Sequence, residues 1–465
     1  MGIIIGLAFT IFFSLACRKY CYFNGETNDL TIYAHAMART GHGQFMPIYF
    51  TNQGFLEIRI DLIMLLWLPI YKLWPSFYSL LFYQSLMLTI AAWPFYLLAK
   101  HVLKNNRAAL ALGVAFLLFP TIASQHVNQF HDDQMALPFL MFAFYFFVKE
   151  DFRKFMCMIV LTCLAKESVA LTTAAFGIYA LLLRRSWKWV VAPISFSAAY
   201  LIVAVKIMSA GVSGVGAGLY TSMTYLDAYG KTPTEVLQTF LTRPGFVWAT
   251  TFSAQKIDFL WKLLLPVLFV LPIFTFAILI VLPNLLLNLV ASNSAMTVIP
   301  WHYNILVGGT LLAASVLGIK RLADYLPPSM TPKLTTGISV AMVALSLLGL
   351  RDWFRFEEYQ PKPYQNVLER AVAVIPPDAS VLCPDPLLAH FSNHSQIINP
   401  WTILMVRKDA SAVTNYDYVI VDGNWRSGSA LAQAQLVNLF NQNPDLARRF
   451  TVLIQESNVY VLRRL

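Results

Sequence analysis

The chain has 465 residues, of which 57% are hydrophobic and only 12% are charged. An ordinary soluble domain has roughly 25% charged residues, so this composition excludes a soluble globular protein and predicts a multi-pass membrane protein. The net charge of +10 would suggest nucleic acid binding in a soluble protein, but the lysines and arginines stand in short clusters between apolar runs. Such clusters are typical of membrane topology signals, and we therefore expect no nucleic acid partner.

Apolar runs follow one another along the first three quarters of the chain. They lie near residues 2–17, 62–74, 77–99, 108–124, 135–148, 155–165, 168–183, 189–205, 259–290, 303–319 and 334–350. Run 259–290 is long enough for two helices with a break at Pro272, because proline disrupts the helix ladder. Run 62–74 follows the polar start LEIRID and is interpreted as a half-span or an interfacial helix. We expect a mainly α-helical transmembrane bundle with about 11–12 membrane segments.

The positions of the basic clusters predict which segments face outward. Lysines and arginines gather at 100–107, 149–154, 184–188 and 320–333, and the positive-inside rule places all four clusters in the cytoplasm. The segments midway between them then face outward, namely 18–58, 125–134, the turn at 166–167, about 207–258, 292–304 and the tail from about 351.

The tail changes character and predicts a second domain. Short strand-like segments (SVLC, QIIN, YDYVIVDG and FTVLIQESNVYVLRRL) alternate with helical stretches at 363–374 and about 427–442. This alternation favours a small α/β domain. We expect a transmembrane domain over 1–350, with outer loops at 18–58 and 207–258, and a soluble α/β domain over 351–465 on the outer face.

Loop 18–58 contains the segment ETNDLTIYAHAMART, which predicts a short amphipathic helix with Asn28 or Asp29 as its N-cap. Capping is one interpretation of Asp29. The other is a carboxylate near the membrane face that accepts a proton, with His35 further along the same helix. The two roles are compatible.

The segment FHDDQ places His131, Asp132 and Asp133 between two apolar runs. One interpretation is a solvated outer loop, since these residue types are common in turns. The other is a lining of a functional cavity, because adjacent aspartates repel and are easier to explain beside a cation or a basic group. Metal ligation by His131, Asp132 and Asp133 is conceivable, but the segment lacks a spaced second pair of ligands.

Lys166 and Glu167 stand at the turning point of run 155–183. The two arms hold about 11 and 16 residues, which makes helices of ~17 and ~24 Å, shorter than a hydrocarbon core of ~30 Å. The turn therefore lies below the outer surface. Lys166 and Glu167 form either a structural ion pair or a site in which Lys166 binds a phosphate and Glu167 orients it or holds a metal. His302 and Tyr303 are either aromatic-belt residues or further ligands.

The segments NDLTIYAHAM, LLWLPIYKLWP, FHDDQMALP, LAKESVAL, LPNLLLNLVASN and WHY, in this order, resemble a prokaryotic membrane family known as domain of unknown function 2079. The resemblance covers nearly the whole chain, including YDYVIVDG in the tail. That family in turn resembles the GT-C superfamily of membrane glycosyltransferases, which use polyprenyl-phosphate sugars. An acidic residue in the first outer loop is typical of GT-C enzymes, and Asp29 stands at the matching place.

Several positions depart from the family pattern. Ala34, Ser168 and Asn284 stand where carboxylates are usual, while Asp132 replaces a proline and Asp133 a glutamate. The loss of three carboxylates weakens a metal site and leaves Asp29 as the main catalytic candidate. A divalent cation stays open as a cofactor.

The first functional hypothesis is a GT-C-like glycosyltransferase of the bacterial plasma membrane. Asp29 would be the general base on an acceptor hydroxyl, and Lys166 with Arg59 or His302 would stabilise the leaving phosphate. His131, Asp132 and Asp133 would bind sugar hydroxyls or a cation. The expected partners are membrane lipids, a polyprenyl-phosphate sugar donor and an envelope acceptor. The alternatives are a transporter or flippase, and a non-catalytic protein of envelope assembly.

Overall fold

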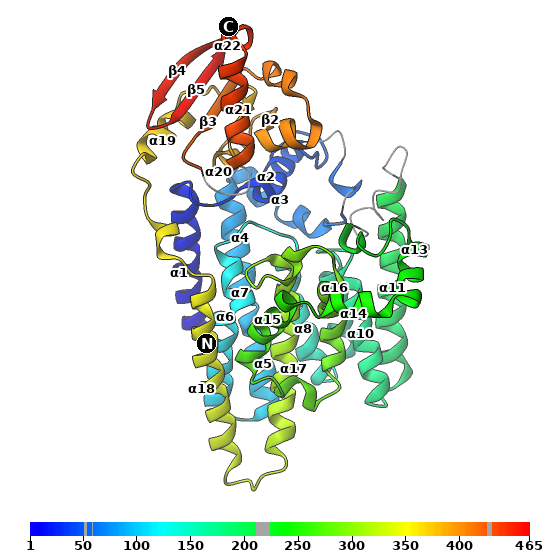
Figure 1. Cartoon of the computed structure of the whole chain (residues 1–465). Coiled ribbons are helices and arrows are strands. Elements are labelled where there is room, and N and C mark those ends of the chain that lie inside the picture. Colours follow the sequence, from blue (N-terminus) through cyan, green and yellow to red (C-terminus); the bar gives the residue numbers. More distant parts are fainter. Residues whose placement is uncertain (51–53, 58, 211–223, 426–429) are drawn as a thin grey trace. The chain divides into compact units, whose positions relative to one another are not determined.

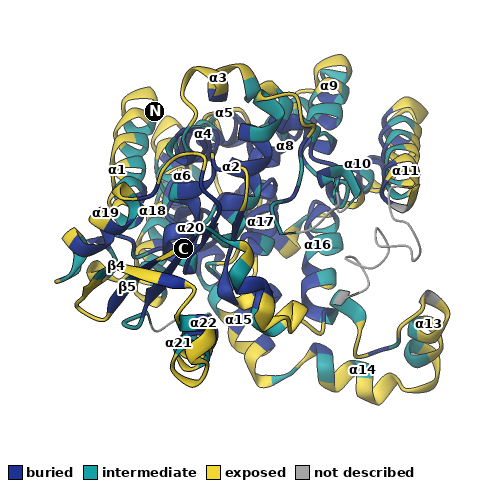
Figure 2. Ribbon diagram, turned by 90° about the horizontal axis from the view of Figure 1, so that it is seen from above, coloured by how far each residue is buried: buried dark blue, intermediate teal, exposed yellow. Residues whose placement is uncertain are grey.

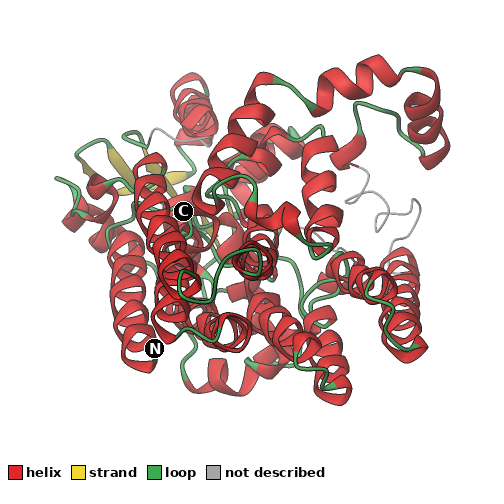
Figure 3. Cartoon of the chain, turned by 90° about the horizontal axis from the view of Figure 1, so that it is seen from below, coloured by secondary structure: helices red, strands yellow, loops and turns green. Residues whose placement is uncertain are grey.

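The computed structural model describes residues 1–50, 54–57, 59–210, 224–425 and 430–465. Within these ranges every strand lies after residue 380, and the remaining elements are helices and turns (Figure 3). The chain divides into two compact units. The helical unit comprises Met1–Phe13, Leu56–Leu66 and Tyr83–Arg355, and the mixed unit comprises Ser14–Phe55, Trp67–Phe82 and Phe356–Leu465.

The α-helices before the tail are α1 (Gly2–Cys21), α2 (Asn28–Gly41), α3 (Leu68–Leu73), α4 (Phe77–Ile90), α5 (Ala92–Leu103), α6 (Asn106–Leu118), α7 (Pro120–Ala123), α8 (Asp133–Val148), α9 (Phe152–Cys163), α10 (Val169–Leu182), α11 (Trp187–Ala210), α13 (Pro233–Thr242), α14 (Pro244–Thr251), α15 (Ala254–Leu264), α16 (Ile278–Val290), α17 (Ile305–Ala323) and α18 (Thr331–Gly349) (Figure 1). The tail contains the helices α19 (Gln365–Ala373), α20 (Asp385–Leu388), α21 (Ala430–Gln442) and α22 (Pro444–Ala447).

Five helical segments among the described residues are long and apolar enough to cross a membrane. They are Gly2–Cys21, Phe77–Leu103, Trp187–Met208, His302–Ala323 and Thr331–Asp352. A sixth candidate is the pair α6 and α7, which is bent by 51° at its break. The bend has a local cause: Pro120 begins α7, and the residue before a proline is driven out of the helical region, as Phe119 is with ψ 127°. Three shorter apolar helices, α8, α10 and α16, have 16, 14 and 13 residues.

The structure explains why long helices are fewer than the predicted membrane segments. Run 259–290 is broken as expected around Pro272: α15 ends at Leu264, α16 begins at Ile278, and short 3-10 turns lie between them. Segment 62–74, which is fully described, forms a 3-10 turn at Leu62–Leu66 and the six-residue α3, neither of which is long enough for a straight span.

The structure also shows how run 155–183 and part of the predicted outer loop 207–258 fold. Run 155–183 forms α9 and α10, with Lys166 and Glu167 in the connection between them. In the predicted outer loop 207–258, residues 211–223 lie outside the described residues. After them, the loop forms α13 and α14.

Helix α17 is the centre of the helical unit. Most of its residues are buried, and it packs against α5, α8 and α16. Its two buried hydroxyls donate within the helix, Thr310 to the Leu306 carbonyl at 2.8 Å and Ser315 to the Leu311 carbonyl at 2.8 Å. These bonds satisfy polar atoms in an environment that offers no water.

Gly318 lets α17 approach the turn at Leu271–Phe274 closely, because a Cβ at this position would collide with the Leu271 carbonyl oxygen. The atoms in the way are backbone atoms, so no flexible side chain can move aside.

We expect Gly318→Ala to destabilise the folded protein by about 1–3 kcal/mol, because the added methyl group overpacks this contact. Thermal unfolding of the purified protein measures this. Gly337→Ala on α18 is the matched control, because no atom lies within 4 Å of its added Cβ. There, alanine is expected to be neutral or to stabilise the helix by about 0.5–1 kcal/mol. Equal losses in both variants would contradict the packing argument.

The mixed unit is built on a five-stranded sheet in the order β2-β1-β3-β5-β4. Its strands are β1 (Val381–Leu382), β2 (Ile397–Ile398), β3 (Tyr418–Asp422), β4 (Phe450–Glu456) and β5 (Val459–Arg464). The first three strands are parallel, with Val381 opposite both Ile397 and Tyr418, and β5 pairs antiparallel with β3 and β4. This confirms the small α/β region expected from the tail.

Alternation along the strands gives the sheet two buried faces. Ile420 on β3 packs in one core with Leu368 of α19, whereas Val419 and Val421 pack in a second core with Leu436 of α21. Successive side chains of a strand point to opposite faces, so one helix covers each side. Strand β4 lies at the edge of the sheet and is exposed over most of its length (Figure 2).

Candidate functional site

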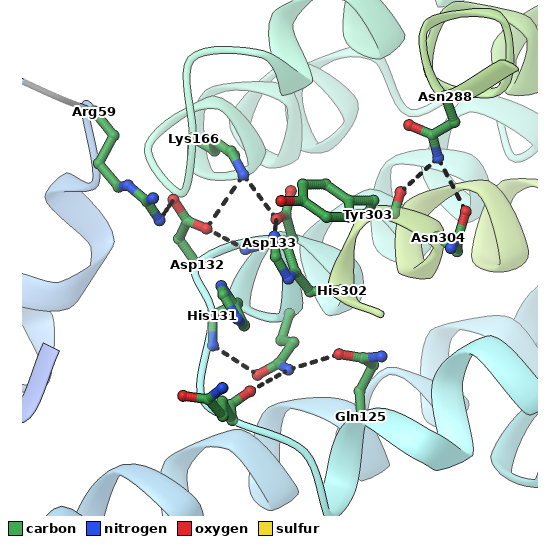
Figure 4. A network of polar contacts seen from close by, with 12 residues as sticks. Arg59, Gln125, His131, Asp132, Asp133, Lys166, Asn288, His302, Tyr303 and Asn304 are labelled. Atoms are coloured by element: carbon green, nitrogen blue, oxygen red, sulfur yellow. Dashed lines mark hydrogen bonds and ion pairs between the residues drawn. The ribbon is translucent and has the colours of Figure 1, made fainter. Parts of the chain in front are cut away.

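Most of the predicted site residues meet in one cluster of the helical unit, which we call the charged cluster. Its elements are the segment that leads into α8, the connection between α9 and α10, the 3-10 turn His302–Asn304 before α17, and the segment around residue 60 (Figure 4). The cluster contains Arg59, Asp61, His131, Asp132, Asp133, Lys166, Glu167, His302 and Tyr303.

Lys166 supplies the basic group beside the two aspartates. Its Nζ lies 2.8 Å from Asp133 Oδ2 and 3.5 Å from Asp132 Oδ1. Arg59 Nη1 lies 3.7 Å from Asp132 Oδ2, so Asp132 stands between two cations (Figure 4). Asp132 also caps α8, because its Oδ1 accepts the N–H of Asp133 at 3.0 Å. The solvated-loop interpretation of this segment is wrong, since all three of its ionisable side chains are buried.

The predicted ion pair between Lys166 and Glu167 is wrong. Lys166 instead pairs with the aspartates, and Glu167 Oε2 accepts the backbone N–H of Ile60 at 3.1 Å. The reason is geometric: the two residues are adjacent in a turn, and each side chain reaches a different neighbouring element. Glu167 thereby fixes the segment that also presents Arg59.

His302 lies inside the cluster. Its ring stacks on His131 with 3.5 Å between the ring centroids, and its Nε2 lies 3.9 Å from Asp133 Oδ2. Burial of His302 contradicts a role in an exposed aromatic belt. The carbonyl of Tyr303 accepts a hydrogen bond from Asn288 Nδ2 at 3.0 Å, which links α16 to the turn before α17.

Asp61 is a member of the cluster that sequence reasoning missed. Its side chain is 0% exposed, and within the described part of the chain neither carboxylate oxygen accepts a hydrogen bond. With Asp132, Asp133 and Glu167 it gives the cluster four carboxyl groups beside the cations of Lys166 and Arg59. A buried carboxylate without a donor is costly, which marks Asp61 as a functional candidate. The available signal was the three charged residues in LEIRID just before an apolar run.

The three residues proposed as metal ligands contact other side chains of the cluster. Across the described ranges, no group of three or more His, Cys, Asp or Glu side chains is arranged to hold a metal ion. His131 stacks on His302, while Asp132 and Asp133 contact Lys166. The arrangement of these three side chains therefore gives no support to a cation at His131, Asp132 and Asp133.

The catalytic candidate Asp29 belongs to the mixed unit, where it is the second residue of α2 and is partly exposed. The predicted cap is wrong, because the residue that flanks the helix is Thr27 and its side chain does not cap it. The acceptor comes from the tail: Asp385 Oδ1 accepts the N–H of Thr27 and that of Asn28, the latter at 3.0 Å. The side chain of Asn28 donates to Asp29 Oδ1 at 3.2 Å.

His35 lies on α2 as expected, but its side chain is buried near the ring of Tyr49. Burial lowers the pKa of His35 to about 4, so the imidazole is neutral at pH 7. The structure therefore places Asp29 and His35 in the mixed unit, and the other predicted site residues in the helical unit.

A family match shows to which protein family the chain belongs. Residues 19–458 match the family described as "Predicted membrane protein (DUF2079)". The chain belongs to the DUF2079 family. No curated protein matches the DUF2079 chain.

Two solved structures share the fold of this DUF2079 protein. The crystal structure of ArnT from Cupriavidus metallidurans bound to undecaprenyl phosphate matches with a TM-score of 0.60 and 11% identity, covering 100% of this chain and 97% of that one. The apo structure of the same ArnT matches with a TM-score of 0.55 and 11% identity, covering 99% and 98%. ArnT is a GT-C glycosyltransferase. The DUF2079 protein thus has a helical, multi-span membrane fold like that of ArnT, with a small mixed sheet in the tail.

Proposed function

We propose that this DUF2079 protein is a GT-C-like glycosyltransferase that transfers a sugar from a polyprenyl-phosphate donor to an envelope acceptor at the outer face of the bacterial plasma membrane. The observation that carries the proposal is the fold, which matches over the full length a structure determined with undecaprenyl phosphate. The placement on the outer face rests on the basic clusters, which mark the opposite ends of the helices as cytoplasmic.

Asp29 is the general base of the proposed reaction. Its carboxylate takes the proton of an acceptor hydroxyl, whose oxygen attacks the anomeric carbon of the donor with inversion. The bond between that carbon and the phosphate oxygen breaks, and the polyprenyl phosphate leaves with the electron pair. A base must reach the hydroxyl, and Asp29 is partly exposed at the start of α2, held from one side by Asn28.

Lys166 and Arg59 are the proposed ligands of the phosphate. A leaving phosphate gains negative charge, which cations in a buried site stabilise strongly. Both cations contact Asp132, with side chains 14% and 28% exposed, so an entering phosphate would take over contacts that the aspartates now make. His131, Asp132, Asp133, His302 and Tyr303 would then bind sugar hydroxyls or orient the cations, with Glu167 holding the segment around Arg59. His35, which lies on the same helix as Asp29, would support that base.

The test uses the full-length protein in lipid nanodiscs with undecaprenyl phosphate carrying a hexose or a pentose. Bacterial envelope extract supplies the acceptor, and mass spectrometry follows the release of undecaprenyl phosphate. We expect release that depends on the protein and the extract. In proteoliposomes, movement of the intact glycolipid between leaflets without sugar cleavage would overturn the proposal in favour of a flippase.

A further inference from the structure

The carboxyl ends of the parallel strands in the mixed unit hold residues that contact α2. Asp385 follows β1 closely, and Asn399 follows β2 directly. Because β1 and β2 are parallel, these ends lie at one edge of the sheet. In open α/β sheets this edge is where ligands bind. Here the first turn of α2 occupies it.

Asp385 holds the backbone of that turn. Its Oδ1 accepts two amide hydrogens, and its carbonyl accepts the hydroxyl of Thr27. Thr27 Oγ1 in turn accepts the N–H of Ala389 at 3.2 Å. The first amides of a helix have no partner within the helix, so an acceptor from outside stabilises the turn and fixes its direction. Thr27 is 1% exposed, so water does not replace these bonds.

Asn399 fixes the side chain next to Asp29. Asn28 Oδ1 accepts hydrogen bonds from Tyr49 Oη and from Asn399 Nδ2, the latter at 3.1 Å. Two donors on the oxygen leave the amide nitrogen of Asn28 to donate to Asp29 Oδ1. Asn399 is itself oriented, because its Oδ1 accepts from Thr402 N at 2.8 Å and from Thr402 Oγ1 at 2.6 Å.

We propose that Asp385 and Asn399 are positioning residues that hold Asp29 in its catalytic orientation, one through the backbone of α2 and the other through Asn28. The two strand ends that carry Asp385 and Asn399 then help to orient the proposed base. This inference rests on the proposed role of Asp29 as the base.

The ionisable groups that face Asp385 are Tyr20, Glu26, Asp29, Tyr49 and Cys383. Burial, aided by the charges of Glu26 and Asp29, raises the pKa of Asp385 to about 7 against the effect of the two amide hydrogen bonds. Ionised Asp385 accepts those bonds more strongly than the neutral acid. The turnover of the wild type should therefore increase as the pH rises through about 7.

The release assay tests the inference with Asp385→Ala, Asp385→Asn and Asn399→Ala. Misplacing a catalytic group lowers turnover more than substrate binding, so we expect kcat to fall by about 10- to 100-fold for Asp385→Ala with KM within about twofold. Asp385→Asn keeps an acceptor and should recover part of kcat, but it should lack the inflection near pH 7. Asn399→Ala should lower kcat without changing the pH profile, and it keeps the test valid if Asp385→Ala does not fold.

The matched control is Asp417→Ala. Asp417 also joins two parts of the tail, accepting from Ser380 N at 3.0 Å and from Arg464 Nη2 at 2.7 Å, and both of these partners lie outside α2. Its kcat should stay within about twofold of wild type. Unchanged kcat and pH profile in the Asp385 and Asn399 variants of an active enzyme would overturn the inference alone. If the wild type releases no undecaprenyl phosphate from any donor, the proposed function fails and the inference falls with it.

Discussion

Replacing Asp29 with asparagine is expected to lower the release of undecaprenyl phosphate by about 10²- to 10⁴-fold, the usual contribution of a general base. Asparagine preserves the shape of the side chain and can still accept the hydrogen bond from Asn28, but it cannot take a proton from the acceptor hydroxyl. The loss should therefore appear in kcat, while the melting temperature and the elution volume of the purified protein stay as in the wild type.

Glu26→Gln provides the matched control. Glu26 is a carboxylate three positions before Asp29, and it faces the same Asp385. Its substitution removes one negative charge from the start of α2 without touching the proposed base, so kcat should change by less than about tenfold. Full activity of Asp29→Asn would rule out Asp29 as the base. An equal loss of kcat in both variants would show that the negative charge near α2 matters, and not proton transfer to Asp29.

Replacing Lys166 with methionine is expected to destabilise the folded protein by about 3–5 kcal/mol, because one partner of a buried ion pair is lost. Asp132 and Asp133 would keep their buried positions without the ammonium group that lies 2.8 Å from Asp133. Thermal unfolding in nanodiscs gives the change in stability. The binding of undecaprenyl phosphate to the folded fraction gives the effect on the proposed phosphate site, where a marked loss of affinity is expected.

The double variant Lys166→Met with Asp133→Asn separates the two effects. Removing both charges should restore much of the stability, since the uncompensated carboxylate is gone, but it should not restore phosphate binding. Lys154→Met is the control for loss of a lysine from an exposed pair, because Lys154 contacts Asp151 at the surface. Exposed pairs contribute little, so its stability should match the wild type. A single Lys166 variant as stable as wild type would contradict the described ion pairs.

Local patterns in the sequence were enough to predict several of the elements. Run 259–290 is too long for one helix and contains Pro272, and the break occurs there. YDYVIVDG is one of the predicted strand-like segments, and it forms β3, whose five residues are all buried because helices cover both faces of the sheet. The segment around Asp29 has the periodicity of an amphipathic helix, and α2 forms over it. Each of these features depends on residues that are close together in the sequence.

The site could be predicted only in part, because its contacts join distant residues. The cap of α2 was misassigned since its acceptor, Asp385, is 357 residues away from Asn28 in the sequence. The partner of Lys166 was assigned to its neighbour Glu167, but the fold brings Asp133 closer from 33 residues away. Nothing in the sequence near Asp61 shows that its side chain is fully buried beside other carboxyl groups. Side-chain partners of this kind depend on how the elements pack.

The mixed unit combines segments from both ends of the chain, so it cannot be complete until the tail has been synthesised. Its first segment, which contains α2, leaves the ribosome hundreds of residues before β1 and β2 do. At about 5–20 residues per second, the 357 residues between Asn28 and Asp385 take roughly 20–70 s to translate. Throughout that time the first amides of α2 lack the acceptor that the finished chain provides. Asp29 therefore acquires its surroundings only late in translation, so an unfinished chain carries the proposed base without the contacts that orient it.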